Sequence, residues 1–420
     1  MTETIHTLVI GGGQAGVATS AHLQKQGVPH LVLERARIAE RWRTERWDSL
    51  VANGPAWHDR FPEAEFDGVA PDAFPTKDQV AAYFEGFAQS RALPVRTGVE
   101  VTRLTREGDH FHAATPQGEI VARNVVVATG PFQKPAIPTL VTDPAITQLH
   151  SSSYRNPGQL PEGAVLVVGA GSSGAQIAEE LVRAGRRVFL SIGPHDRPPR
   201  RYRGQDFVWW LGRLGKWDMK TPTPGTEHVT IAVSGAYGGH TMDFRRLAGL
   251  GVTLLGRGGD YRDGSLHFAA DLATNIANGD RNYLSVLDEA DSYAAAQGLD
   301  LPVDPEARSF LPLPPEVADP ILTLNLRAEG ITTILWATGF QLDFGWIDLD
   351  IFREDGRPRH SEGVTEVPGL YFVGLPWLSC RGSAFIWGAW RDAERLAAHI
   401  AGRARPDPAG KSLRIFAENS

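Results

Sequence analysis

The sequence has 420 residues with a formal net charge of −7, and 42% of its residues are hydrophobic and 22% charged. This length predicts two or three domains with buried cores. The acidic balance argues against nucleic acid as the main partner. The single cysteine, Cys380, excludes an internal disulfide and a CxxC redox pair.

The chain enters an apolar run at residues 5–10 without a basic segment and an apolar signal region before it. No run approaches the roughly 18 to 20 apolar residues of a membrane span. With the single thiol, these features predict a cytoplasmic protein without an integral membrane segment. Attachment to a membrane surface through a partner stays open.

The first predicted elements are a strand at residues 8–10, a glycine-rich turn, a helix at 15–26 and a strand at 30–34. The same pattern returns as a strand at 165–168, a second glycine-rich turn, a helix at 175–184 and a strand at 187–192. Two such units predict an α/β protein with two Rossmann-like dinucleotide-binding domains, each built on a parallel sheet.

Other elements fill the space between and after these units. Residues 95–104 and 111–114 predict a small antiparallel layer, and 124–130 a buried strand that ends at a glycine. Prolines 131, 135 and 138 indicate a linker. The later predictions are strands at 321–326, 331–337 and 370–374, a proline-rich stretch at 301–320 and a helix at 389–402.

We therefore expect one domain to be inserted into the other. The first domain would comprise residues 1–155 and 325–420, and the second, inserted domain residues 160–320.

Each glycine turn has the GxGxxG spacing. Its first glycine permits a tight turn, its second admits a pyrophosphate to the backbone, and its third lets the helix pack on the strand. In the first unit Glu34 ends the second strand, where its carboxylate can accept hydrogen bonds from the ribose hydroxyls of adenosine. This predicts FAD at the first turn.

The second unit has Ile192 where the first has Glu34, and basic side chains follow it. Guanidinium groups suit a 2′-phosphate, which a carboxylate would repel. The second turn is therefore predicted to bind NADPH rather than NADH. The alternative is that these arginines form a solvated loop.

Further segments resemble the flavin-containing monooxygenase superfamily, which includes plant YUCCA-type enzymes and Baeyer–Villiger monooxygenases. Ala52-Asn53-Gly54-Pro55 with Phe61-Pro62 is similar to the family's asparagine–proline loop beside the flavin, and Phe74-Pro75-Thr76 with Tyr83 to its next helix. Segment 149–154 matches the end of the FxGxxxHxxxY fingerprint. Segments 337–340 and 373–374 resemble the late ATG segment and a flavin-contacting strand end.

The chain also departs from the family pattern. The phenylalanine and glycine of the fingerprint fall on Pro144 and Ile146. The Baeyer–Villiger form, which ends in tryptophan, is not matched.

The resemblance implies that NADPH reduces FAD, that the reduced flavin captures dioxygen as a C4a hydroperoxide, and that this species transfers one oxygen atom to a small organic substrate. Nitrogen, sulfur and carbonyl substrates all stay open. By resemblance, the Asn53 amide is the candidate catalytic group beside the flavin. The alternative is a turn-forming Asn-Gly pair.

The full set of predicted cofactor-binding residues follows from the turns and the resemblance. It comprises Gly11, Gly13, Gln14, Ala15, Gly16, Glu34, Arg35, Arg41, Trp42, Val101, Thr129, Gly130, Gly169, Gly171, Ser172, Ser173, Gly174, Ser191, Arg197, Arg200, Arg201, Thr338, Gly339 and Gly374.

Two rival functions stay open. One is a flavin-dependent reductase that passes electrons from NAD(P)H to a quinone or another acceptor without oxygenation. The other is a non-catalytic flavin or nucleotide sensor. The histidines show no metal-ligand spacing, so we expect no metal site. A homodimer is common in related enzymes. Residues 207–217 predict an aromatic core helix, with a lid over a substrate channel as the alternative.

Overall fold

Strand β1 (Thr2–Ile10) lies near the middle of the first sheet and pairs in parallel with β2 (His30–Glu34) and β6 (Gly118–Val127). The computed structural model describes residues 2–220 and 230–404. The last four residues of β1 are buried, because both faces of the sheet are covered at this point. Such burial explains the continuous apolar run in the sequence.

The strand order of the first sheet is β19-β20-β21-β6-β1-β2-β3, and β5 and β4 extend it from β6 as an antiparallel pair. The remaining strands are β3 (Val95–Thr97), β4 (Arg103–Glu107), β5 (His110–Thr115), β19 (His360–Ser361), β20 (Val364–Thr365) and β21 (Leu370–Phe372).

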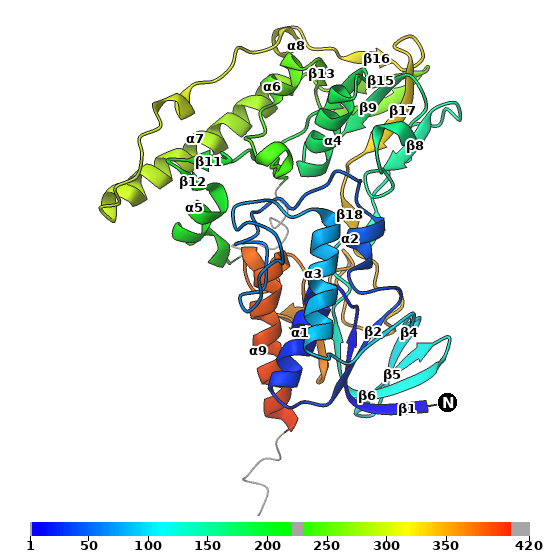
Figure 1. The fold of residues 1–420 in the computed structure, drawn as a ribbon. Helices are drawn as coiled ribbons and strands as arrows, with labels where there is room; N and C mark the ends of the chain where they lie inside the picture. The colour runs from blue at the N-terminus through cyan, green and yellow to red at the C-terminus, as the bar shows by residue number, and fades with distance from the viewer. Residues whose placement is uncertain (1, 221–229, 405–420) are drawn as a thin grey trace, which may run out of the picture.

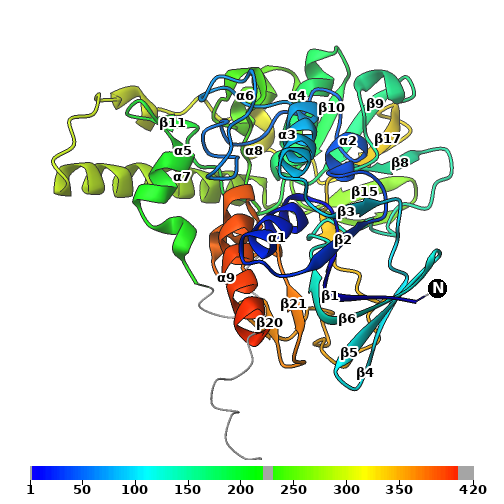
Figure 2. The same cartoon turned by 60° about the horizontal axis from the view of Figure 1, so that its bottom comes forward.

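Helices cover one face of this sheet and form a buried apolar cluster with it. Figure 2 shows α1 (Gln14–Lys25) beside α9 (Ile386–Ala404). The first unit therefore packs a helix from the start of the chain against one from its later part. The short α2 (Glu40–Thr44) and α3 (Lys77–Ser90) complete this layer. Helix α3 begins at a capping box, in which the hydroxyl of Thr76 accepts a hydrogen bond from the amide of Gln79.

The second sheet contains five parallel strands in the order β13-β10-β9-β17-β8. Figure 1 shows β9, β17 and β8 of this sheet in the upper part of the molecule. These strands are β8 (Thr147–His150), β9 (Ala164–Val168), β10 (Val188–Ser191), β13 (Val252–Leu255) and β17 (Ile331–Trp336). The helices of this unit are α4 (Ser172–Arg183), α5 (Phe207–Arg213), α6 (Phe244–Gly249), α7 (Leu272–Ala296) and α8 (Pro315–Ala318).

Smaller elements surround the second sheet. They are the three-stranded sheet of β14 (Gly258–Arg262), β15 (Ser265–Phe268) and β16 (Thr323–Asn325), the hairpin of β11 (Arg201–Tyr202) and β12 (Gln205–Asp206), and the 3-10 turns η1 (Pro157–Gln159), η2 (Lys216–Asp218), η3 (Ala236–Gly238) and η4 (Pro305–Arg308). A further 3-10 turn, η5 (Arg381–Ala384), precedes α9 in the first unit.

The chain crosses between the two units twice. It leaves the first unit through β7 (Lys134–Pro135) and returns through β18 (Phe340–Gln341), and these two short strands pair with each other in antiparallel fashion. The two crossing segments therefore touch, and together they form the connection between the units.

The structure confirms the predicted α/β fold with two dinucleotide-binding units. Part of the predicted antiparallel layer is wrong, because β3 pairs in parallel with β2, whereas β4 and β5 pair in antiparallel fashion and β5 continues the layer onto β6. The domain ranges stay a prediction. Sheet membership assigns β8 and β17 to the second unit, since both pair there in parallel, whereas the ranges expected from the sequence placed them in the first.

Candidate functional site

The two glycine turns have nearly the same backbone geometry. Gly11 and Gly169 follow β1 and β9 with φ angles of 112° and 115°, in the region that side chains disfavour. A Cβ atom on Gly16 would lie 1.8 Å from the carbonyl oxygen of Gly11, and one on Gly174 would lie 1.9 Å from that of Gly169. Each third glycine therefore lets its helix pack against the turn, as the GxGxxG spacing predicted.

Both helices also begin without a side-chain cap, at Gly13 and Gly171. Uncapped amides at a helix start can bind the oxygens of a diphosphate. The two starts differ in one respect. In the second, the carbonyl of Ile231 accepts hydrogen bonds from both the amide and the hydroxyl of Ser172, each at 2.8 Å. Fewer donors are therefore free at the second start than at the first.

One cavity of about 2030 Å³ extends along both turns. Most of the predicted cofactor-binding residues line it. They are Gly11, Gly13, Gln14, Ala15, Glu34, Arg35, Arg41, Trp42, Val101, Thr129, Gly130, Gly169, Gly171, Ser172, Ser173, Ser191, Thr338, Gly339 and Gly374. The candidate catalytic residue Asn53 lines the same cavity. The tertiary fold thus brings residues from both units to one space, which is large enough for extended ligands.

The Glu34 carboxylate is fixed at the end of β2. Its Oε2 accepts a hydrogen bond from the amide of Gly12 at 2.6 Å, and its Oε1 accepts one from the amide of Ala36 at 2.9 Å. Each carboxylate oxygen keeps a second lone pair. The half-buried carboxylate can therefore still accept hydrogen bonds from ribose hydroxyls in the cavity, as predicted for the adenosine of FAD.

The predicted 2′-phosphate site at Arg197, Arg200 and Arg201 is wrong in its details, since none of these side chains lines the cavity. Arg197 is buried and paired with Asp280 at 2.7 Å. Arg200 is buried and paired with Asp206. The exposed Arg201 donates to the carbonyls of residues 238 and 239. The arginines predicted to bind a phosphate are therefore already bound to carboxylates and backbone carbonyls of the protein.

Sequence analysis missed Arg257, which lines the cavity just after β13. The adjacent turn is held by Ser191, whose hydroxyl donates to the carbonyl of Gly256 at 2.9 Å and accepts from the amide of Gly258 at 3.1 Å. Arg257 is exposed and forms no ion pair with the residues the structure describes. The carboxyl ends of adjacent parallel strands meet at one edge of a sheet, so recognising β13 would have pointed to this residue.

Arg46 is a second missed cation of the cavity. Its guanidinium lies 5.2 Å from the ring centre of Phe132 and 5.5 Å from that of Trp42, and it donates to the carbonyl of Glu45. Burial lowers its pKa to about 10, because the charged form loses water. The neighbouring Arg41 is paired with Glu45 at 2.6 Å, so Arg46 is the better candidate for an anionic ligand.

Asn53 is held from three sides. Its carbonyl accepts a hydrogen bond from Arg200 at 2.6 Å, and its side-chain Oδ1 accepts one from Nε2 of Gln176 at 2.8 Å. The amide of Gly54 donates to Asp59 at 2.9 Å, where a Cβ on this glycine would collide with the carboxylate. The Asn53 side chain is exposed even so, within the cavity lining. The pair is more than a turn, because residues of both units fix it.

His150 and Tyr154, from the partial fingerprint, have structural contacts. Nε2 of His150 is 2.9 Å from the carbonyl oxygen of Gly339, and the hydroxyl of Tyr154 donates to Glu180 at 2.5 Å. Burial, followed by the Glu180 hydrogen bond, raises the pKa of Tyr154 well above its usual value. Neither residue lines the cavity.

Helix α5 buries Trp210 completely, as an aromatic core helix should. Trp217, four residues beyond this helix, is also largely buried but lines the cavity. The aromatic segment therefore contributes to the core and to one end of the cavity.

Comparison with known proteins identifies the family. A CzcO-like oxidoreductase of Geobacillus kaustophilus is 34% identical over 401 residues, which cover 94% of this chain and 98% of that protein. This chain belongs to the CzcO-like oxidoreductases. Residues 8–203 also match the family described as pyridine nucleotide-disulphide oxidoreductase.

The resemblance of this CzcO-like chain to the flavin-containing monooxygenase superfamily is confirmed. The rice indole-3-pyruvate monooxygenase YUCCA1 is 32% identical over 191 residues, which cover 44% of this chain and 47% of that enzyme. A mutant of the flavin monooxygenase of Stenotrophomonas maltophilia shares the fold with a TM-score of 0.68 and 19% identity, covering 96% of this chain and all of that one. The comparisons thus support an oxidoreductase with an FAD- and NADP-binding fold.

Within residues 2–220 and 230–404, no helix combines the length and apolar character that a membrane span requires. The same part of the chain contains no group of three or more His, Cys, Asp or Glu side chains arranged for a metal ion.

Proposed function

We propose that the protein is an NADPH- and FAD-dependent monooxygenase that transfers one oxygen atom from dioxygen to a small organic substrate. FAD binds along the first glycine turn and Glu34, and NADPH along the second turn. Arg257, which lines the cavity beside Ser191, would contact the 2′-phosphate. FAD would supply electron transfer and oxygen activation. The side chains of this chain would bind, orient and exclude water.

The orientation of the Asn53 amide carries the proposal. Gln176 donates one Nε2 hydrogen to the carbonyl of Val233 at 2.6 Å and the other to Oδ1 of Asn53. The carbonyl of Asn53 is likewise engaged, by Arg200. The Nδ2 group of Asn53 has no hydrogen-bond partner among the described residues, and Asn53 lines the cavity, so these hydrogens are available to a ligand there. A fixed donor at this place can stabilise negative charge that develops on oxygen.

This arrangement distinguishes the proposal from a simple reductase. Hydride transfer between two bound nucleotides needs positioning, but it needs no oriented amide donor beside the flavin. The single cysteine further argues against disulfide reduction, which requires a second thiol. The cytoplasmic location, the homodimer and the preference for NADPH over NADH belong to the proposal as well.

The test measures whether oxygen from dioxygen enters the product. Protein loaded with FAD is reduced by NADPH without oxygen, mixed rapidly with isotopically labelled dioxygen, and offered candidate amine, sulfide and ketone substrates. The proposal expects a transient flavin absorbance distinct from oxidised FAD and label in the product. Asn53→Ala should keep NADPH-dependent flavin reduction but release hydrogen peroxide in place of product.

Each other result assigns a different function. Rapid turnover with a quinone, without labelled product or a transient absorbance, would indicate a reductase. Tight FAD binding without reduction by NADPH would indicate a sensor. Coupled oxygenation that survives Asn53→Ala unchanged would remove the role of Asn53.

A further inference from the structure

One end of the cavity combines aromatic walls with a cation. Trp217 and Phe385 line this end with ring centres 4.8 Å apart, and Arg381, four residues before Phe385, also lines the cavity. Arg381 begins the turn η5, immediately before helix α9. The end therefore presents both apolar surface and a positive charge to a ligand.

The Arg381 guanidinium has no hydrogen bond or ion pair with the residues that the structure describes, although its backbone amide donates to the carbonyl of Met219 at 2.9 Å. Burial lowers the pKa of Arg381, and the field of Asp196 opposes this shift. Asp196 also lines the cavity, but no ion pair within 4.0 Å joins the two. Arg381 is half-buried, and a partly desolvated cation without a direct partner favours an anionic ligand.

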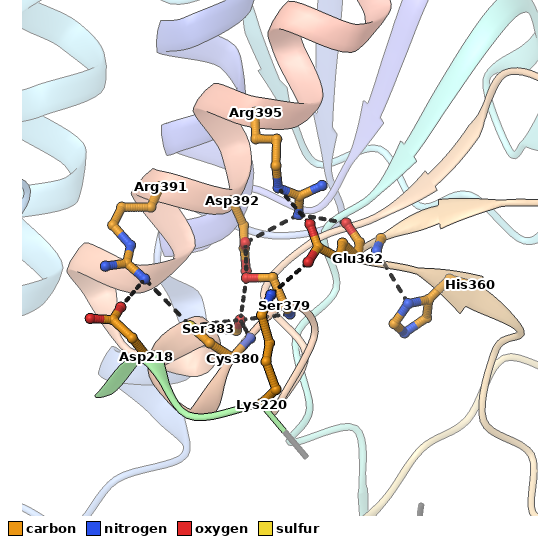
Figure 3. Close-up of polar contacts among 11 residues, drawn as sticks. Asp218, Lys220, His360, Glu362, Ser379, Cys380, Ser383, Arg391, Asp392 and Arg395 are labelled. Carbon is orange, nitrogen blue, oxygen red and sulfur yellow. Dashed lines mark hydrogen bonds and ion pairs between the residues drawn. The ribbon is translucent and has the colours of Figure 1, made fainter. Parts of the chain in front are cut away.

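Hydrogen bonds hold the backbone on both sides of Arg381. The hydroxyl of Ser383 accepts hydrogen bonds from the amides of Ser379 and Cys380 at 3.0 and 3.1 Å (Figure 3). The hydroxyl of Ser379 donates in turn to Asp392 at 2.5 Å, which also pairs with Arg395. This network fixes the turn to helix α9, so little ordering of the backbone is needed when Arg381 binds a ligand.

The neighbouring arginines are already engaged. Arg391 pairs with Asp218 at 2.9 Å and lies 3.4 Å from the sulfur of Cys380, and Arg395 contacts Asp392 and Glu362 (Figure 3). Arg381 differs from both, because its side chain lines the cavity and theirs do not.

We propose that Arg381 binds the carboxylate of the substrate and that the aromatic walls receive its apolar body. The protein would thus select small organic acids with an aryl or similar apolar group. A guanidinium presents two parallel N–H donors, which match a carboxylate. That the ligand is a substrate rests on the proposed monooxygenase function, but the binding itself does not.

The test compares pairs of ligands that differ in charge alone. Benzoate, phenylacetate and 3-phenylpropionate are titrated against their neutral amides on the FAD-loaded protein, by calorimetry and by the flavin spectrum. We expect at least one acid to bind roughly tenfold or more tightly than its amide, the effect of a charge-assisted hydrogen bond. Arg381→Gln should bring this ratio near one, and Arg381→Lys should keep part of it.

Asp196→Asn is the matched variant, and its expected effect on acid binding is opposite to that of Arg381→Gln. Asp196 is the acidic group whose field reaches Arg381, so its neutralisation should tighten the binding of the acid and leave that of the amide unchanged. A purely structural role for Arg381 would not produce opposite effects in the two variants.

The other outcomes overturn the inference. Acids that bind no more tightly than amides, undetectable binding included, contradict it. Loss of FAD from Arg381→Gln would instead assign the guanidinium to the cofactor. Failure of oxygen transfer with the acid preference intact would refute the monooxygenase proposal and leave the carboxylate site standing.

Discussion

Gln176 could place its amide in two orientations, and the carbonyl of Val233 selects one of them, because only Nε2 can donate to it. The orientation of Gln176 in turn fixes that of Asn53, because Oδ1 of Asn53 accepts the second hydrogen bond from Nε2 of Gln176. Two hydrogen bonds of a residue on α4 thus decide which group of Asn53 faces the cavity. Arg257 and Ser191 show the same principle, since one side chain orders the turn that presents another.

Substitution of Gln176 tests whether this residue sets the orientation of the Asn53 amide. In Gln176→Glu the new carboxylate can only accept, so it should bind Nδ2 of Asn53 and turn the amide oxygen towards the cavity. We expect coupled oxygenation to fall about tenfold or more, within the range for a lost donor to developing charge. Gln176→Leu, which leaves the amide free to rotate, should have a smaller effect. Peroxide release per NADPH oxidised measures the coupling in both variants. Unchanged coupling in Gln176→Glu would show that Gln176 does not set the orientation of Asn53.

Arg257 should determine the choice of nicotinamide nucleotide. In Arg257→Ala the KM for NADPH should rise roughly tenfold, the value of one charge-assisted hydrogen bond to a phosphate. The KM for NADH is the internal control and should change little, because NADH lacks the 2′-phosphate. Steady-state kinetics with both nucleotides measures this. Equal increases in the two constants would assign Arg257 to another part of the nucleotide.

At the scale of elements, helix α7 is tied to the loop after β10 by one carboxylate. Asp280 pairs with Arg197 at 2.7 Å and with Arg245, at the start of α6, at 2.5 Å. Burial by itself would raise the pKa of Asp280, but hydrogen bonds from Arg245 and Arg197 lower it overall. This network explains why the arginines after β10 stabilise the second unit and are not free to bind a phosphate.

Asp280→Asn should therefore destabilise the second unit by about 3 kcal/mol at neutral pH, because it removes the nearest carboxylate from two buried guanidinium groups and leaves them to share Asp243, which lies 3.4 Å from Arg245 and 4.0 Å from Arg197. The contribution of the lowered pKa is complete above the unfolded value of 3.8 and is lost as the pH falls through the folded value. The gap between variant and wild type should thus shrink below pH 3.8. Denaturant unfolding at pH 7 and pH 3 measures it.

Asp260→Asn serves as the control for this prediction. It removes an exposed pair with Arg262 at 3.5 Å and should change stability by less than about 0.5 kcal/mol. An Asp280→Asn variant that unfolds like this control would show that the network has little energetic importance.

On the scale of the whole molecule, the two units meet where β7 pairs with β18, where Trp47 and Leu50 of the first unit pack into the apolar core of the second, and where the cavity walls face each other. Asn53, from a loop of the first unit, contacts Gln176 of the second at this junction. The candidate active site is therefore shared between units, and its geometry depends on their relative position. Ligands that bind along the cavity should stabilise the assembly of both.

FAD should accordingly raise the thermal stability of the protein. At about one hundred times its Kd, it should add about 2.7 kcal/mol to the free energy of unfolding. FMN is the control ligand, because it lacks the adenosine and the second phosphate that Glu34 and the first helix start would bind, so it should stabilise less at equal concentration. Thermal unfolding of the FAD-free protein with each ligand measures this. Equal shifts would contradict the assignment of the first turn.

The sequence by itself determined the two glycine turns, their strands and helices, and Glu34, because short spacings and local periodicity encode these features directly. Only the tertiary structure decided which arginines face the cavity. Arg197 and Arg200 find their carboxylates on α7 and β12, and Arg257 and Arg381 reach the cavity from segments far from either glycine turn. Pairing between charges distant in the chain depends on packing, which no local pattern records.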